Sequence, residues 1–124
     1  MNFEQTPEFS KELKKFGKKW RRIEADLSVL MTALSTIYGG AKGIPAEHIR
    51  QTFFATRKAA VLQLIAQDGE VVKVRLDSSD LNGDMLRVTY IRSGKSILLV
   101  ELYAKNDKAR EDSARIQRYL KQGQ

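Results

Sequence analysis

The stretch at residues 71–104 constrains the fold more than any other part of the chain, because its apolar and charged residues alternate. Successive side chains of a β-strand point to opposite faces of a sheet. In 71–76 (VVKVRL) one face is then aliphatic, and the opposite face carries Lys73 and Arg75. In 86–92 (LRVTYIR) the same rule places Arg87 away from the face that holds Tyr90. The pattern predicts a sheet with a core-facing side and a cationic side.

A third strand is predicted at 97–104 (ILLVELYA), which is apolar on both faces except at Glu101. Such a strand is typical of the centre of a sheet that is covered on both sides, so we expect helices against it. Lys105 and Lys108 follow directly, and positive charge therefore gathers around the sheet. Lysine and arginine that alternate with valine also mark the solvated face of an ordinary antiparallel sheet. The pattern alone leaves both interpretations open.

Two helices are predicted before the sheet. Thr6, with a proline after it, can cap the first, and apolar residues then recur at helical spacing as far as Trp20, which we expect in the core. A second helix over 23–38 ends at two glycines, so the pair predicts a helical hairpin that packs on the sheet. Further along, 59–76 with its Asp-Gly turn predicts a β-hairpin, and 107–122 can form a C-terminal helix.

At 124 residues the chain has the length of one domain, residues 1–124, with a single core. Lysine and arginine number 22 against 15 aspartate and glutamate, which gives a net charge of +7 and favours a polyanionic partner such as nucleic acid or an acidic protein. Seven of these cations lie at 11–22. They form either a solvated helix face or a surface that docks on a phosphate backbone.

Several classes of site are excluded or disfavoured by composition. The chain has no cysteine, which excludes disulfides, thiolate metal sites and cysteine nucleophiles. His48 is the only histidine, so we expect it at the surface or at a helix end, and we expect neither a metal nor a cofactor. No apolar run approaches the roughly 20 residues that span a bilayer, and the N-terminus lacks the pattern of a signal peptide. We therefore expect a cytoplasmic protein with no membrane partner.

Three short motifs, KVRL at 73–76, LRVTY at 86–90 and LLVELYAKND at 98–107, together resemble the sheet of the RelE superfamily of bacterial type II toxins, in its RelE- and HigB-like branch. Their order and spacing carry the resemblance, which extends more loosely over nearly the whole chain. It implies an α+β fold in which an N-terminal helical hairpin packs on a mainly antiparallel sheet of four to five strands, with a C-terminal helix. It also implies a short edge strand at 2–5.

The cleaving members of this superfamily are endoribonucleases that act on mRNA in the ribosomal decoding site. The resemblance therefore implies the toxin of a type II toxin–antitoxin system, a ribosome-dependent mRNA interferase that needs no metal. The implied partners are mRNA, the ribosome and an acidic antitoxin protein, whose charge would complement that of this chain. Two alternatives stay open, namely a ParE-like toxin that inhibits DNA gyrase and a basic protein that binds RNA without cleaving it.

The resemblance also implies roles for individual residues. Cleavage by the 2′-hydroxyl of RNA requires a base, cations for the developing phosphorane charge and an acid for the leaving 5′-oxygen. Lys73 matches the first lysine of the family's K-x-K/R-L strand and is the expected base, since neighbouring cations favour the neutral amine. Arg75 and Arg87 have planar forks that suit a phosphate clamp, and Lys105 is the expected acid. Further contacts to RNA are expected from Lys14, Lys18, Arg21, Arg57, Lys58, Tyr103 and Lys108.

The sequence departs from the family pattern in two places. Some relatives carry a tyrosine or a histidine beyond the last strand, where this chain reads NDKAREDSARI at 106–116, so Tyr103 or Tyr119 would have to stand in. The connection at 77–84 (DSSDLNGD) is longer than expected and brings three acids near the phosphate site. The first departure predicts reduced activity or an altered codon preference, and the second counts against strong RNA binding at the phosphate site.

Overall fold

The computed structural model describes residues 1–40, 42–55, 58–66, 69–76 and 86–122. Over these residues the chain forms four helices and five strands, so the predicted α+β class is confirmed for the described part of the chain. The elements in chain order are β1 (Asn2–Gln5), α1 (Pro7–Lys19), α2 (Ile23–Gly39), α3 (Ala46–Ala55), β2 (Ala59–Ala66), β3 (Gly69–Leu76), β4 (Leu86–Ser93), β5 (Ser96–Ala104) and α4 (Ser113–Gln122).

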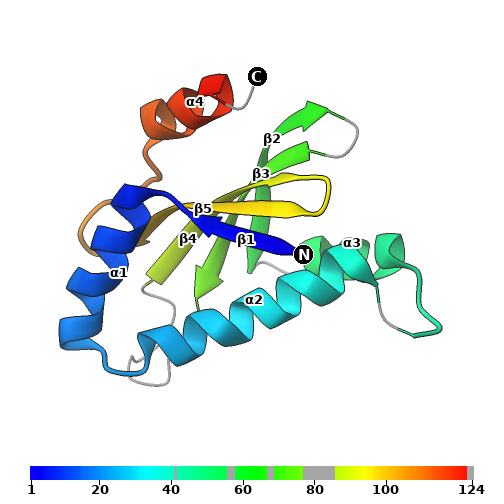
Figure 1. The fold of residues 1–124 in the computed structure, drawn as a ribbon, viewed down its shortest axis with the longest axis horizontal. Coiled ribbons are helices and arrows are strands. Elements are labelled where there is room, and N and C mark those ends of the chain that lie inside the picture. Colours follow the sequence, from blue (N-terminus) through cyan, green and yellow to red (C-terminus); the bar gives the residue numbers. More distant parts are fainter. Residues whose placement is uncertain (41, 56–57, 67–68, 77–85, 123–124) are drawn as a thin grey trace.

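One five-stranded sheet organises the molecule, with the strand order β1-β5-β4-β3-β2 (Figure 1). Strands β2 to β5 pair antiparallel with their neighbours, whereas β1 runs parallel to β5. The sheet is therefore mixed, which corrects the prediction of a mainly antiparallel sheet. Two parallel strands need a long crossover between them. Among the described residues that crossover contains three helices and three strands, so β1 and β5 pair although they are far apart in the sequence.

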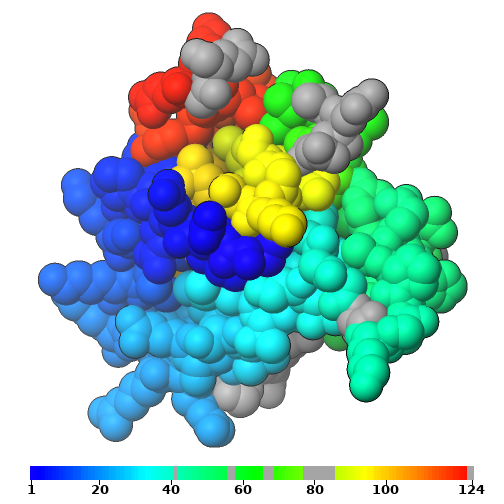
Figure 2. Space-filling model, turned by 45° about the vertical axis from the view of Figure 1, so that its right-hand side comes forward, coloured from blue at the N-terminus to red at the C-terminus, as the bar shows by residue number. Residues whose placement is uncertain are grey.

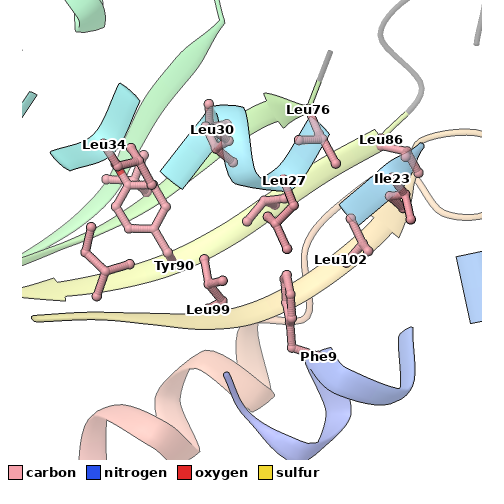
Figure 3. Packing of buried hydrophobic residues seen from close by; sticks show 14 of the residues in the cluster. Phe9, Ile23, Leu27, Leu30, Leu34, Leu76, Leu86, Tyr90, Leu99 and Leu102 are labelled. Atoms are coloured by element: carbon pink, nitrogen blue, oxygen red, sulfur yellow. The ribbon is translucent and has the colours of Figure 1, made fainter. Parts of the chain in front are cut away.

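The main core lies between α2 and one side of the sheet (Figure 1). Ile23, Leu27, Leu30 and Leu34 recur at helical spacing along α2 and are buried. They meet the aliphatic residues and Tyr90 that alternate along β3 and β4, as Figure 3 shows. Burial of side chains of this size stabilises the fold by about 1.5–3 kcal/mol each. The side of the sheet that alternation marked as apolar is thus the side that faces the core.

A β-bulge in β5 breaks the alternation. Thr89 of β4 lies opposite Glu101, but the next residue, Tyr90, lies opposite Leu99, so Val100 is an extra residue. Because of this extra residue, Leu99 stays in the main core while Glu101 turns to the outer side of the sheet. Strict alternation in the sequence would instead have put Glu101 and Leu99 on the same face.

Helix α1 lies along the part of β5 that extends past β1. The Thr6 hydroxyl caps α1 by accepting a hydrogen bond from Phe9 N–H (3.0 Å), and it donates one to the Val100 carbonyl of β5 (3.1 Å). Further along α1, Glu12 Oε1 accepts a hydrogen bond from Leu102 N–H (3.1 Å). These contacts satisfy backbone groups at a sheet edge that would otherwise be open. The arrangement of α1 and α2 as a hairpin stays a prediction.

Helix α4 lies on the opposite side of the sheet from α2 (Figure 1), and in Figure 2 the surface of β1 and of the turn between β4 and β5 separates the two helices. Ile116 is the buried residue of α4 and packs against apolar residues of β3, β4 and β5. Ion pairs join α4 to α1: Arg115 to Glu12 (2.9 Å) and Arg118 to Glu8. The outer helix is therefore held by polar contacts to α1 as well as by a small apolar cluster.

Helix α3 is fastened to the sheet through a buried carboxylate. Glu70 of β3 pairs with Arg50 of α3 and accepts a hydrogen bond from the Tyr38 hydroxyl of α2 (2.6 Å). The Tyr38 hydroxyl also lies 2.8 Å from that of Tyr90. Burial is the main cause that raises the pKa of Tyr38, and the neighbouring Tyr90 and Glu70 add to it. The phenol therefore stays protonated and donates to Glu70, which joins α2, α3 and β3 at this end of the molecule.

Candidate functional site

The outer side of the sheet brings the predicted cations together. Arg75 of β3 lies directly opposite Arg87 of β4, and Arg87 lies opposite Tyr103 of β5. Lys73 lies two residues before Arg75 on the same strand, opposite Thr89. Residues directly opposite each other on antiparallel strands have Cβ atoms about 4.5–5.5 Å apart. The side chains therefore form two adjoining rows on one surface.

A cavity of about 270 Å³ opens over these rows. Its walls include the four residues expected to act in catalysis and two of those expected to contact RNA. The lining residues are Lys58, Ala59, Ala60, Lys73, Arg75, Arg87, Tyr103, Lys105 and Ala109. Five cationic side chains thus border a single space, and a concave site lined by one sign of charge attracts anions strongly.

The two arginines are set in the sheet in different ways. Arg87 is 8% exposed, and its Nη1 donates a hydrogen bond to the Leu86 carbonyl (3.1 Å). Arg75 is half-buried, and its backbone N–H donates to the Lys58 carbonyl (2.9 Å), which fixes Lys58 beside β3. Like charges directly opposite each other across strands destabilise a sheet. An anion bound between the two guanidinium groups would relieve this repulsion, and a phosphate matches their planar forks.

Two carboxylates that the sequence interpretation did not single out adjoin the cavity. Glu111 Oε1 lies 3.4 Å from Lys73 Nζ, and Glu101 forms an ion pair with Lys108. Lys73 therefore has an anionic neighbour in addition to the cations that were expected around it. The Lys73–Glu111 contact depends on the path of the chain after β5, for which the sequence offers no signal. The only hint at Glu101 was that it is the single charged residue of an apolar strand.

Glu101 anchors one wall of the cavity. It is 1% exposed, and its Oε1 accepts a hydrogen bond from Asp112 N–H (2.8 Å). The ion pair with Lys108 holds a second point of the segment that follows β5. Asp112 in turn caps α4, because its Oδ1 accepts a backbone N–H from the first turn of that helix (3.0 Å). Lys105 begins this segment, whose first turn is also closed by hydrogen bonds from Asp107 N–H and Lys108 N–H to the Ala104 carbonyl (3.0 and 3.2 Å).

Tyr103 contributes a phenol that stays protonated. Burial is the main cause that raises its pKa to about 12, the negative charges of Glu111 and Glu101 add to the effect, and Arg87 opposes it. The Lys108 ammonium lies 5.3 Å from the centre of the Tyr103 ring, within the range of a cation–π contact. At neutral pH Tyr103 is therefore a hydrogen-bond donor toward any anion in the cavity.

The remaining described residues among those expected to contact RNA do not line the cavity. Lys108 adjoins it through its contact with Tyr103. Arg57 and the connection at 77–84, with its three acids, lie outside the described residues. Three exposed cations lie on α1 or in the turn that follows it: Lys14, Lys18 and Arg21. They extend the basic surface but are separate from the cavity walls.

Other kinds of site receive no support in the part of the chain that the structure describes. Within these residues no group of three or more His, Cys, Asp or Glu side chains is arranged to hold a metal ion. His48 is exposed on α3, as expected. None of the described helices combines the length and the apolar character that a membrane crossing requires.

Comparison with known proteins gave no relative. Neither a scan against protein-family models nor searches of curated proteins and of solved structures found a match to this chain. A functional interpretation therefore depends on the chemistry of the cavity and on the resemblance of the strand motifs that form it.

Proposed function

We propose that the protein is the toxin of a type II toxin–antitoxin system, a RelE-like endoribonuclease that cleaves ribosome-bound mRNA in the cytoplasm. The convergence of Lys73, Arg75, Arg87 and Lys105 on one cavity carries the proposal. These are the residues that the strand motifs singled out, and they come from β3, from β4 and from the end of β5. The RelE-like arrangement of the helices, including the hairpin, is part of the same proposal.

In the proposed reaction the 2′-oxygen of one nucleotide attacks the adjoining phosphorus. A new 2′-O–P bond forms as the bond to the 5′-oxygen breaks, which leaves a 2′,3′-cyclic phosphate and a 5′-hydroxyl. Negative charge develops on the phosphorane oxygens. Arg75 and Arg87 stabilise this charge from two neighbouring strands with charge-assisted hydrogen bonds. Because both groups are already fixed on the sheet, little reorganisation is needed as the charge develops.

Protons move through Glu111, which is paired with Lys73, and through Lys105. Within the Lys73–Glu111 pair, the Glu111 carboxylate accepts the proton of the attacking 2′-hydroxyl and becomes a carboxylic acid, while Lys73, which the resemblance implied as the base, stays an ammonium beside it. Lys105 gives a proton to the leaving 5′-oxygen, and solvent then carries a proton from the pair back to Lys105. Tyr103 donates a hydrogen bond to a phosphate oxygen in the same cavity. The cycle leaves every group in its starting state.

The partners of the protein follow from its charge. The net charge of +7 and the exposed lysines of α1 suit long-range attraction to mRNA and to the ribosome. The same charge suits an acidic antitoxin, because complementary charge speeds association.

RNA binding without cleavage is the second candidate function. The exposed cations of α1 favour it, because they could bind a phosphate backbone without any contribution from the cavity. The two candidates differ in what happens to the RNA, since only the first changes its covalent structure.

Incubation of the purified protein with labelled mRNA, with and without ribosomes, tests the proposal. We expect cleavage on the ribosome and products that end in a cyclic phosphate. The double variant Lys73→Met/Arg75→Met should cleave at least about 100-fold more slowly than the wild type, because two charge-assisted interactions are lost. Lys95→Met, at the exposed turn between β4 and β5, removes one charge away from the cavity and is the control. Intact mRNA that is bound in a salt-dependent way would instead support the second candidate.

A further inference from the structure

A second cavity lies on the other side of the segment that follows β5, away from the cationic cavity. It has a volume of about 220 Å³ and is formed between the C-terminal half of α1 and the residues that end and follow β5. Its lining residues are Lys15, Phe16, Lys19, Trp20, Ala104, Asn106 and Asp107. This volume is below the range of about 300–1,000 Å³ that is typical of sites for drug-sized ligands, so it suits a single planar group.

The two cavities share one stretch of backbone. Lys105 lines the cationic cavity, and the next two residues, Asn106 and Asp107, line the second. Ala104, on the other side of Lys105, is buried in the main core and also faces the second cavity. The cationic cavity is thus on the outer side of the sheet, and the second one is beside the main core, with this stretch between them. A chain of nucleotides that fills both cavities with adjoining units would have to cross over Lys105.

The α1 wall of the second cavity combines aromatic rings with ammonium groups. Phe16 and Trp20 stack on each other, with ring centroids 5.2 Å apart and an interplanar angle of 11°. Both rings are largely buried, so they offer an apolar wall rather than an open stacking surface. Lys19 Nζ lies 5.2 Å from the Trp20 ring centre, and Lys15 Nζ lies 5.9 Å from that of Phe16. Two cations are thus held beside the rings, where a phosphate could meet them.

The opposite wall carries groups that match the edge of a base. Asn106 and Asp107 are both exposed and border the cavity. An amide both donates and accepts hydrogen bonds, whereas a carboxylate only accepts them. The carboxylate of Asp107 repels a phosphate but can accept a hydrogen bond from an exocyclic amino group. This wall therefore favours a base within the cavity, with the phosphates outside it near Lys15 and Lys19.

We propose that the second cavity is a base-binding subsite for the nucleotide next to the scissile phosphodiester. It selects a base that presents an exocyclic amino group to Asp107, which means guanine, adenine or cytosine rather than uracil. The position of this base relative to the cleaved bond rests on the proposed function. The binding of the base itself does not, because it depends only on the walls described above.

Binding of short RNA oligonucleotides of two, three and four nucleotides tests this subsite. The oligonucleotides carry a 2′-deoxy sugar at each attacking position, so that the full-length protein binds them without cleaving them. We expect affinity to rise by about tenfold or more when the added nucleotide fills the second cavity. Lys19→Gln and Asp107→Asn should lose this increment and leave the affinity for the dinucleotide unchanged. Asp107→Asn should also lose the preference against uracil.

Lys11→Gln is the matched control, because Lys11 is exposed on the same helix but does not line the cavity. It should weaken binding by the same small factor at every length. If Lys19→Gln also weakens RNA binding by the same factor at every oligonucleotide length, the subsite is overturned. The subsite is also overturned if RNA does not bind at Lys19 but an acidic peptide does. Length-dependent binding without any cleavage would reject the nuclease but keep the subsite. If Lys19→Gln still cleaves mRNA, and its dependence on RNA length and its base preference are those of the wild type, the nuclease is kept and the subsite is rejected.

Discussion

Replacement of Arg75 by methionine separates a catalytic role of the cavity cations from a structural one. Arg75 is half-buried on β3, directly opposite Arg87, and lines the cationic cavity. Methionine keeps an unbranched apolar stem of similar length and removes the guanidinium group. The substitution therefore leaves the packing of the strand nearly unchanged while it removes one side of the proposed phosphate clamp.

Arg75→Met should have a large effect on activity and a small effect on stability. A hydrogen bond to a charged group is worth about 1.5–3 kcal/mol. Its loss in the transition state would lower kcat/KM by about 10- to 150-fold. Like charges that face each other across strands destabilise the sheet by roughly 0.2–1 kcal/mol. Because Arg75 lies half-buried at the wall of the cavity, the loss of its guanidinium group should change the free energy of unfolding by less than about 1 kcal/mol.

Cleavage kinetics on ribosome-bound mRNA and urea unfolding of the same preparation measure the two effects of Arg75→Met. Lys95→Met provides the control for the loss of one positive charge, and it should change neither quantity by more than about 0.5 kcal/mol or its equivalent in rate. If Arg75→Met cleaves as fast as the wild type and unfolds more easily by over 1 kcal/mol, then Arg75 is a structural residue and the clamp is refuted.

Three further predictions follow from the contacts around the cavity and α4. Glu101→Gln keeps the side-chain volume but breaks the ion pair with Lys108. Urea unfolding should therefore show a free energy of unfolding that is lower by about 1–3 kcal/mol, and cleavage should be slower. If neither the free energy of unfolding nor the cleavage rate changes, Glu101 does not anchor this wall. The hydrogen bond from Tyr119 is the main cause that lowers the pKa of Glu8 from its usual value of 4.5, so this attachment of α4 persists above pH 4.5 and is lost as the pH falls through the lowered pKa. The protection factors of the α4 amides against hydrogen exchange should therefore fall in acid, and in Glu8→Gln they should be lowered at every pH. Five cavity cations that neutralise RNA phosphates would release counterions from the RNA. A plot of log affinity for single-stranded RNA against log salt concentration should then have a slope of about −3.5, and Arg75→Met should reduce the size of this slope by about 0.7.

The faces of β3 and β4 could be predicted because a strand has a fixed period of two residues. Val72 and Val74 lie in the main core, while Lys73 and Arg75 lie on the outer side, with Arg87 opposite Arg75. Neighbouring strands extend this rule across the sheet, so the cations of two strands were expected to converge before any contact was known. The period of two also fixes which residues of the strands cannot reach the cavity.

The sequence failed where the structure depends on pairing rather than on local pattern. The bulge at Val100 arises from the register between β4 and β5, and it puts Glu101 on the opposite face of the sheet from Leu99. The parallel pairing of β1 with β5 joins segments from opposite ends of the chain. No local pattern encodes either feature, because both depend on where a distant strand lies.

Isolated charges were also harder to interpret than alternating ones. Glu12 is the only acid among the cations at 11–22, and the sequence suggested no role for it. In the structure it accepts hydrogen bonds from the β5 backbone and from Arg115 of α4, so it joins three elements. Glu111 reaches Lys73 through the path of the segment after β5. Both carboxylates have roles that depend on tertiary contacts alone.

The central claim is that cations from adjacent strands meet at one phosphodiester. A crystal structure of the protein with a short RNA that carries a 2′-deoxy sugar at the attacking position tests this claim most directly. We predict a phosphate in the cationic cavity, within hydrogen-bonding distance of the guanidinium groups of Arg75 and Arg87 and of the Lys73 ammonium. A phosphate bound along α1, with the cavity empty, would contradict the claim.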